Sequence, residues 1–131
     1  MALEYSYGRR TGTGQGIQKQ VCNIWELGTV TNSHSLIEIP MKTHGLKNMC
    51  VVIVLNLSQP DRLWRDFESS LNGIKESVLS SGEESVQVEL LKDKMIKMIG
   101  NTHADIANIN VLPCPVLIIG GKYDLYQNFG K

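Results

Sequence analysis

The order of apolar and polar residues along the chain predicts two buried strands. Residues 49–55 form a continuous apolar run, and residues 116–119 form a second one. Runs of this kind are typical of parallel strands that helices cover on both faces. We therefore expect residues 49–55 to be a central strand and residues 116–119 to be the last strand.

Near the amino terminus the pattern changes to alternation. Leu3, Tyr5 and Tyr7 alternate with less apolar neighbours, which is the period of a half-buried strand, and a second strand is expected over Gln20–Leu27. The glycine-rich segment 12–16 between them resembles a phosphate loop, but the Lys and the Ser or Thr that complete such a loop are absent. The segment therefore predicts the loop of an antiparallel hairpin.

Apolar residues that recur every three or four positions predict a helix that begins near Pro60 or Asp61. Trp64 flanks the apolar stripe of this helix and is expected either to complete the core or to bind a partner. The stripe consists of Leu63, Phe67, Leu71, Ile74 and Val78. Segment 33–48 is compatible with a short helix or a strand that Pro40 ends.

A second helix is predicted after Ser81 and Glu84, which have the spacing of a capping box. Gly100 and Asn101 are expected to end it. Its apolar residues are Val88, Leu91, Met95, Met98 and Ile99. The order of hairpin, buried strand, helices and buried strand predicts an α/β domain with a mostly parallel sheet, flanked by helices, and one antiparallel hairpin.

The amino-acid composition indicates which classes of binding partner are not expected. The 131 residues fit one domain, and 13 basic and 13 acidic residues give a net charge of zero. This balance gives no electrostatic reason to expect nucleic acid or anionic lipid as a partner. We also expect no membrane insertion, because no apolar run approaches the roughly 20 residues that span a bilayer, and no secretory signal follows Met1.

Cysteines and histidines give no sign of a metal or catalytic centre. Cys22, Cys50 and Cys114 are odd in number and far apart, so buried free thiols are expected rather than disulfides or zinc ligands. The three histidines have no ligand spacing and no associated nucleophile, so surface or capping roles are expected. They are His34, His44 and His103.

The most site-like feature is residues 120–124, Gly-Gly-Lys-Tyr-Asp, which follow the last apolar run. GTP-binding folds carry [N/T]-K-x-D at the carboxyl end of such a strand. Lys122 and Asp124 match the Lys and Asp, but Gly121 replaces the polar first residue. No phosphate loop of the G-x-x-x-x-G-K-[ST] type occurs in the chain. Glu26 and Asp124 could form an acid/base pair, but nothing in the sequence fixes their separation.

Four blocks of sequence resemble the light intermediate chain family of cytoplasmic dynein 2, and the family of cytoplasmic dynein 1 is the alternative. Their order and spacing agree over nearly the whole chain. The blocks are residues 3–10 (LEYSYGRR), 25–28 (WELG), 54–60 (VLNLSQP) with Leu63 and Trp64, and 116–124 (VLIIGGKYD).

The resemblance implies a Ras-like G domain in a subunit that is not an enzyme and needs no cofactor. It implies binding to the dynein 2 heavy chain and other dynein 2 subunits, and a role in retrograde intraflagellar transport and cilium assembly. The implied location is the cytoplasm, cilium, basal body and cytoskeleton. The alternative is a small GTPase-like switch, which must bind guanine nucleotide. In the non-catalytic subunit that the resemblance implies, Lys122 and Asp124 are expected to be vestigial guanine-site positions.

The chain also departs from the family pattern. It starts at the L-E-Y block, so residues 1–131 are expected to be a partial G-like domain without the first strand, the phosphate loop and the carboxyl-terminal helix and strand. Trp25 stands where the D-x-x-G motif would place an Asp for magnesium. Without the first strand, Gln20–Leu27 and residues 49–55 would lose a shared neighbour. We expect either that these two strands pair directly with each other, or that the apolar edge of Val51 to Leu55 stays open.

Overall fold

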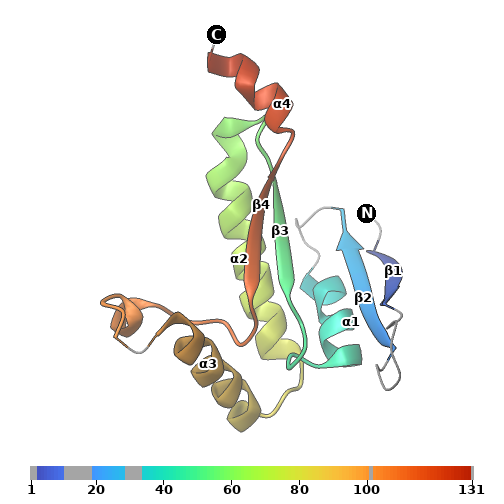
Figure 1. Cartoon of the computed structure of the whole chain (residues 1–131), viewed down its shortest axis with the longest axis vertical. Coiled ribbons are helices and arrows are strands. Elements are labelled where there is room, and N and C mark those ends of the chain that lie inside the picture. Colours follow the sequence, from blue (N-terminus) through green and yellow to red (C-terminus); the bar gives the residue numbers. More distant parts are fainter. Residues whose placement is uncertain (1–2, 11–18, 29–33, 101, 131) are drawn as a thin grey trace.

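The computed structural model describes residues 3–10, 19–28, 34–100 and 102–130. The predicted glycine-rich loop at 12–16 and the predicted helix end at Asn101 lie outside these ranges. The elements are β1 (Leu3–Arg10), β2 (Gln20–Leu27), α1 (His34–His44), β3 (Val51–Asn56), α2 (Leu63–Ser80), α3 (Ser85–Ile99), β4 (Val116–Gly121) and α4 (Tyr123–Tyr126), with 3-10 turns at Pro60–Arg62, Ile106–Asn108 and Gln127–Gly130 (Figure 1).

The described strands form two separate two-stranded sheets. β1 and β2 pair antiparallel, from Leu3 opposite Leu27 to Arg10 opposite Gln20. β3 and β4 pair parallel, beginning with Val51 opposite Val116. The α/β class, the hairpin and the parallel pair are confirmed. The single, mostly parallel sheet is not formed, because no described strand joins β2 to β3.

The two sheets are held together by helices. Helix α1 lies between the hairpin and the β3–β4 pair and contacts both β2 and α2 (Figure 1). Among the described residues, β3 is hydrogen-bonded to a strand on one side only, for example from Val51 N to Pro115 O at 2.9 Å. The sequence left two outcomes open: β2 could pair directly with β3, or the edge of β3 could stay open. Within the described residues β2 and β3 do not pair, and the edge of β3 is open.

The core lies where α1, α2 and α3 meet one face of β3. Its buried members are Met41, Leu46, Ile53, Ile74, Val78 and Leu91. Ile53 is 5% exposed, whereas Val52 and Val54 on the opposite face are 48% and 68% exposed. The expectation that helices cover both faces of this strand was therefore wrong. Within the described residues, α2 contacts β3 from one side only, which leaves the other face in contact with solvent.

Helix α1 continues past Pro40, which was expected to end any element there. A proline inside a helix removes one hydrogen bond and costs about 3 kcal/mol. Burial of Met41 and Leu46, each 1% exposed, offsets this cost. The helix ends instead at His44, and Gly45 follows with a φ of 70° and donates its N–H to Met41 O.

The long helices begin and end close to the predicted positions, with one correction. A 3-10 turn at Pro60–Arg62 leads directly into α2, and Gly100 ends α3 with a φ of 103°. The predicted capping box was wrong. The Ser81 hydroxyl donates to Val78 O at the end of α2, and α3 begins at Ser85 after Glu84, which makes no side-chain capping bond.

Candidate functional site

The candidate site is the loop that follows β4. Lys122 adopts a left-handed conformation, with φ 60° and ψ 39°, and is the first residue after the strand. A residue other than glycine rarely adopts this conformation, so the turn stores some strain. The backbone N–H groups of Leu125 and Tyr126 both donate to Lys122 O at 3.2 Å, which closes the short helix α4. The local fold thus turns Lys122 and Asp124 away from the strand.

A second loop, after β3, lies against the first. Leu57 N donates to Gly121 O at 3.0 Å, which ties the carboxyl ends of β3 and β4 together. The Asn56 Oδ1 atom accepts from Ser58 N at 3.1 Å and from Ser58 Oγ at 2.7 Å. Sequence reasoning missed this polar turn, although an Asn followed two residues later by Ser is a known turn signal.

The predicted site residues are on the surface. Lys122 and Asp124 both have exposed side chains. The Asp124 carbonyl accepts a hydrogen bond from Asn128 Nδ2 at 3.3 Å, and the rings of Tyr123 and Tyr126 stack 6.3 Å apart. The loop therefore presents a cation and an anion at the carboxyl end of the parallel pair, and their role as site residues stays a prediction. Exposed groups of this kind can bind a polar surface.

Trp25, which the resemblance aligned with the Asp of a D-x-x-G motif, acts as a packing residue. Its ring lies 4.8 Å from that of Tyr5 and 6.1 Å from that of His44, in the last turn of α1. The half-buried indole therefore joins the hairpin to α1. Its Nε1 atom is buried and has no hydrogen-bond partner within the described part of the chain.

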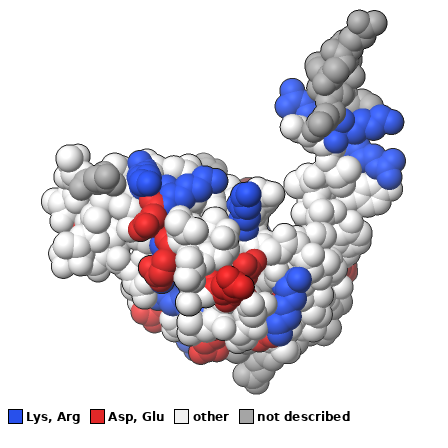
Figure 2. Space-filling model, turned by 90° about the horizontal axis from the view of Figure 1, so that it is seen from below, with Lys and Arg blue, Asp and Glu red and all other residues white. Residues whose placement is uncertain are grey.

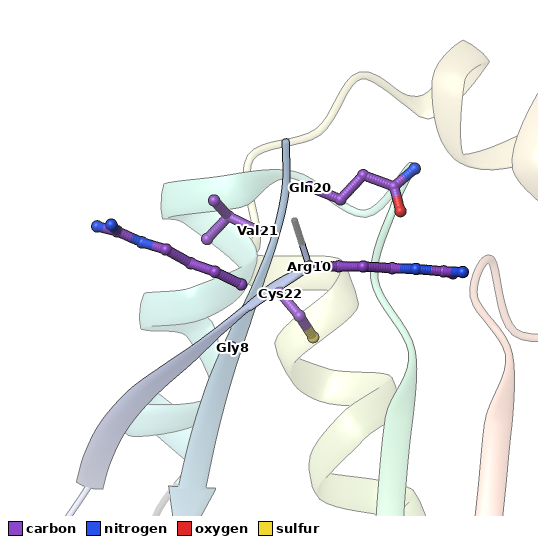
Figure 3. A pocket seen from close by; sticks show the side chains of 6 residues that line it. Gly8, Arg10, Gln20, Val21 and Cys22 are labelled. Carbon is purple, nitrogen blue, oxygen red and sulfur yellow. The ribbon is translucent and has the colours of Figure 1, made fainter. Parts of the chain in front are cut away.

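A hollow lies at the loop end of the hairpin, away from Lys122 (Figure 3). Arg9 and Arg10 are neighbours in β1, so their side chains project from opposite faces of the sheet. The Arg9 guanidinium carbon lies 5.0 Å from the centre of the Tyr7 ring. The residues around the hollow are Gly8, Arg9, Arg10, Gln20, Val21 and Cys22. Sequence reasoning treated this region only as a hairpin, although its basic residues were visible.

The thiols are free, as expected, but only one is buried. Cys22 and Cys50 are exposed, which corrects the expectation for those two residues. Cys22 lies on a hairpin that solvent reaches on both faces, and Cys50 belongs to the uncovered face of the β3–β4 sheet. Burial raises the pKa of Cys114 to about 11, with a smaller contribution from the nearby Cys50.

Residues that could hold a metal are dispersed. Among the described residues, no three His, Cys, Asp or Glu side chains form a group that could bind a metal ion. His44 and His103 are exposed, as predicted, while the side chain of His34 is outside the described part of the chain. Glu26 lies on β2, opposite Glu4, and Asp124 follows β4 of the other sheet, so the structure does not bring this pair together.

The fold is thus an α/β unit with exposed polar loops at the carboxyl ends of a parallel pair. No family model matches the chain. It is similar to cytoplasmic dynein 2 light intermediate chain 1 of Bos taurus (37% identity), Mus musculus (36%) and Danio rerio (32%). The predicted resemblance to the dynein 2 light intermediate chains is confirmed.

These alignments cover nearly all of the chain but a minor part of each relative. In all three comparisons 98% of the chain is aligned. The chain spans 38% of the length of the Bos taurus and Mus musculus proteins and 37% of the Danio rerio protein. No helix within the described ranges combines the length and the apolar character needed to cross a membrane.

Proposed function

We propose that the chain is part of a non-catalytic light intermediate chain of the cytoplasmic dynein 2 motor. The observation that carries the proposal is alignment of 98% of the chain, at 32% to 37% identity, with proteins of that name. The proposed partners are the dynein 2 heavy chain and other dynein 2 subunits. The proposed role is in retrograde intraflagellar transport and cilium assembly, in the cytoplasm, the cilium, the basal body and the cytoskeleton.

The first part of α2 is the surface that we assign to the heavy chain. Trp64 is 68% exposed, so the interpretation that it completes the core was wrong. Its ring contacts that of Phe67, with 5.8 Å between centroids, and Phe67 packs against the core. A large aromatic residue that is exposed but held in place by a core residue has the properties of an interface anchor.

Co-precipitation tests this assignment. The dynein 2 heavy-chain tail is captured with a light intermediate chain that contains this region, either unchanged or with Trp64→Ala. The matched control is Leu79→Ala, because Leu79 lies on the same helix and is 86% exposed. We expect Trp64→Ala to reduce capture at least tenfold and Leu79→Ala to leave it unchanged. Full capture by a folded Trp64→Ala protein would remove Trp64 from the interface, whereas no capture by the unchanged protein would contradict the proposed function.

The fold supports a second part of the proposal, that the chain is a partial Ras-like G domain. β2 and β3 each lack a neighbour on one side within the described residues, and α1 lies between them. One further strand between β2 and β3 would join the two sheets into a mostly parallel one. Thermal melting of this chain beside a longer one, with an additional amino-terminal strand and phosphate loop, tests this. Equal midpoints would contradict it.

A small GTPase-like switch is the second candidate. The position of Lys122 and Asp124 at the carboxyl end of β4 favours it, because this edge is where such folds bind ligands. Trp25 argues against it, since a packed indole cannot ligate magnesium. We therefore propose no catalytic reaction and no cofactor for the chain.

A further inference from the structure

The outer edge of the hairpin is the long strand β1, which among the described residues is paired on one side only, with β2. β1 has eight residues, of which all but Leu3 are exposed. β2 lies between β1 and α1, so β1 is the outermost strand of the molecule (Figure 1). Alternate residues of such an edge direct free N–H and C=O groups outward, which favours pairing with another strand.

The charges at the two ends of β1 have no opposite charge directly across from them on β2. Glu4 lies directly opposite Glu26, and Arg10 lies opposite the uncharged Gln20. Like charges in directly opposed positions destabilise a sheet. Between Glu4 and Glu26 the sequence has three basic residues and no acidic one. Figure 2 shows basic side chains on this projecting part of the surface, whereas acidic and basic side chains are mixed over the body of the molecule.

We propose that β1 pairs antiparallel with β1 of a second copy of the chain, about a two-fold axis at Tyr7. An axis perpendicular to the sheet keeps each face on its own side, so opposed residues must share a face. With Tyr7 opposite its symmetry mate, Glu4 of one copy lies opposite Arg10 of the other. Each Glu4 carboxylate thus faces an Arg10 guanidinium. Within one hairpin, neither group has an oppositely charged residue directly across from it.

The same register places compatible neighbours along the rest of the strand. Tyr5 lies opposite Arg9, which already packs over an aromatic ring in its own chain. Ser6 lies opposite Gly8, where the surface is open and an added β-carbon would contact nothing within 4 Å. A register centred on Ser6 would instead place Glu4 opposite Gly8 and leave Arg10 without a partner. Charge pairing therefore selects the register at Tyr7.

The expected dimer is weak and sensitive to salt. A single pair of edge strands buries less surface than the interfaces of stable complexes, and salt screens exposed ion pairs. The symmetric interface contains the Glu4–Arg10 pair twice. Reversing the charge of either residue therefore converts two attractive pairs into two repulsive ones. We therefore expect each single reversal to raise the dissociation constant of the dimer by about tenfold or more.

Sedimentation equilibrium of the full chain at high protein concentration tests the proposal. Arg10→Glu and Glu4→Lys are each expected to shift the chain toward the monomer, and the double exchange is expected to restore the dimer. Lys94→Glu, at an exposed position of α3, is the matched control and should have no effect. A chain that stays monomeric, or a dimer that neither single reversal weakens, overturns the proposal. Circular dichroism of each variant verifies folding.

Cross-linking tests the position of the axis independently of charge. Tyr7→Cys, in a chain that also carries Cys22→Ser and Cys50→Ser, is expected to form a disulfide-linked dimer under air oxidation. Asn23→Cys in the same background is the control, because Asn23 is paired with Tyr7 but lies on the inner strand. Selective cross-linking through position 7 supports the register. Equal or faster cross-linking through position 23 overturns it.

Discussion

A β-carbon on Gly120 would lie only 2.6 Å from Cδ1 of Leu57. Gly120 lies near the end of β4 and Leu57 follows β3, and Leu57 N donates a hydrogen bond to Gly121 O beside them. The close approach explains why glycine is found at the end of this strand. The contact lies at the end of β4, just before the backbone turns away from the strand at Lys122.

Gly120→Ala is expected to lower the free energy of unfolding by about 1 to 3 kcal/mol, because the new methyl group forces Leu57 to move. Gly121→Ala is the matched control. Its β-carbon would lie 3.6 Å from Val54 Cγ1, an ordinary contact, so the change should be within about 0.5 kcal/mol. Urea denaturation measures both. Equal midpoints for the two variants would show that the loops are not packed as described.

Stability is expected to fall as the pH rises from about 9 toward 11. The Cys114 thiol has its pKa raised by burial from 9.0 to about 11. In that range the unfolded chain has lost this proton and the folded chain still holds it, so higher pH favours unfolding. Denaturation across this pH range measures the slope. Cys114→Ala should make the slope shallower, whereas Cys50→Ala should not, and an unchanged slope in Cys114→Ala would contradict the assignment.

The uncovered face of β3 should tolerate a charge. Val54→Lys is expected to change the free energy of unfolding by no more than about 0.5 kcal/mol and to increase solubility, because Val54 is 68% exposed. Ile53→Ala, on the buried face, should cost roughly 2 to 5 kcal/mol. Chemical denaturation and light scattering measure the two effects. A large loss of stability in Val54→Lys would mean that this face is covered.

Tight binding of GTP is not expected. Phosphate and magnesium contacts contribute most to the affinity of GTP-binding folds, and we expect Trp25 to stand at the magnesium position. Contacts of Lys122 and Asp124 with the base would supply a few hydrogen bonds, from which the cost of immobilising the ligand must be subtracted. Titration calorimetry with GTP and magnesium measures this. A dissociation constant in the micromolar range or tighter would contradict the prediction.

Elements with a strong periodic signal could be predicted from the sequence. The apolar runs at 49–55 and 116–119 became β3 and β4, and the stripe from Leu63 to Val78 became α2. The effect of Pro40 on helix α1 could not be predicted in the same way. Whether a helix continues past a proline depends on how much surface its later residues bury, and the burial of Met41 is a property of the tertiary structure.

The position of Lys122 and Asp124 after the last strand could be predicted from the sequence, but their conformation could not, and their role as a site stays a prediction. A strand that ends in Gly-Gly places Lys122 and Asp124 at the carboxyl edge, which follows from the order of residues alone. The left-handed conformation of Lys122 does not follow from it, because residues other than glycine rarely adopt that conformation. The opposed carboxylates of Glu4 and Glu26 likewise depend on strand register, which the long hairpin loop left undetermined.

The most direct test of the account is capture of the dynein 2 heavy-chain tail by a light intermediate chain containing this region, measured with and without GTP and magnesium. A non-catalytic subunit is expected to bind the tail equally well in both conditions and to release no phosphate. Binding that requires GTP, or measurable hydrolysis during the assay, would contradict the account and establish the switch instead.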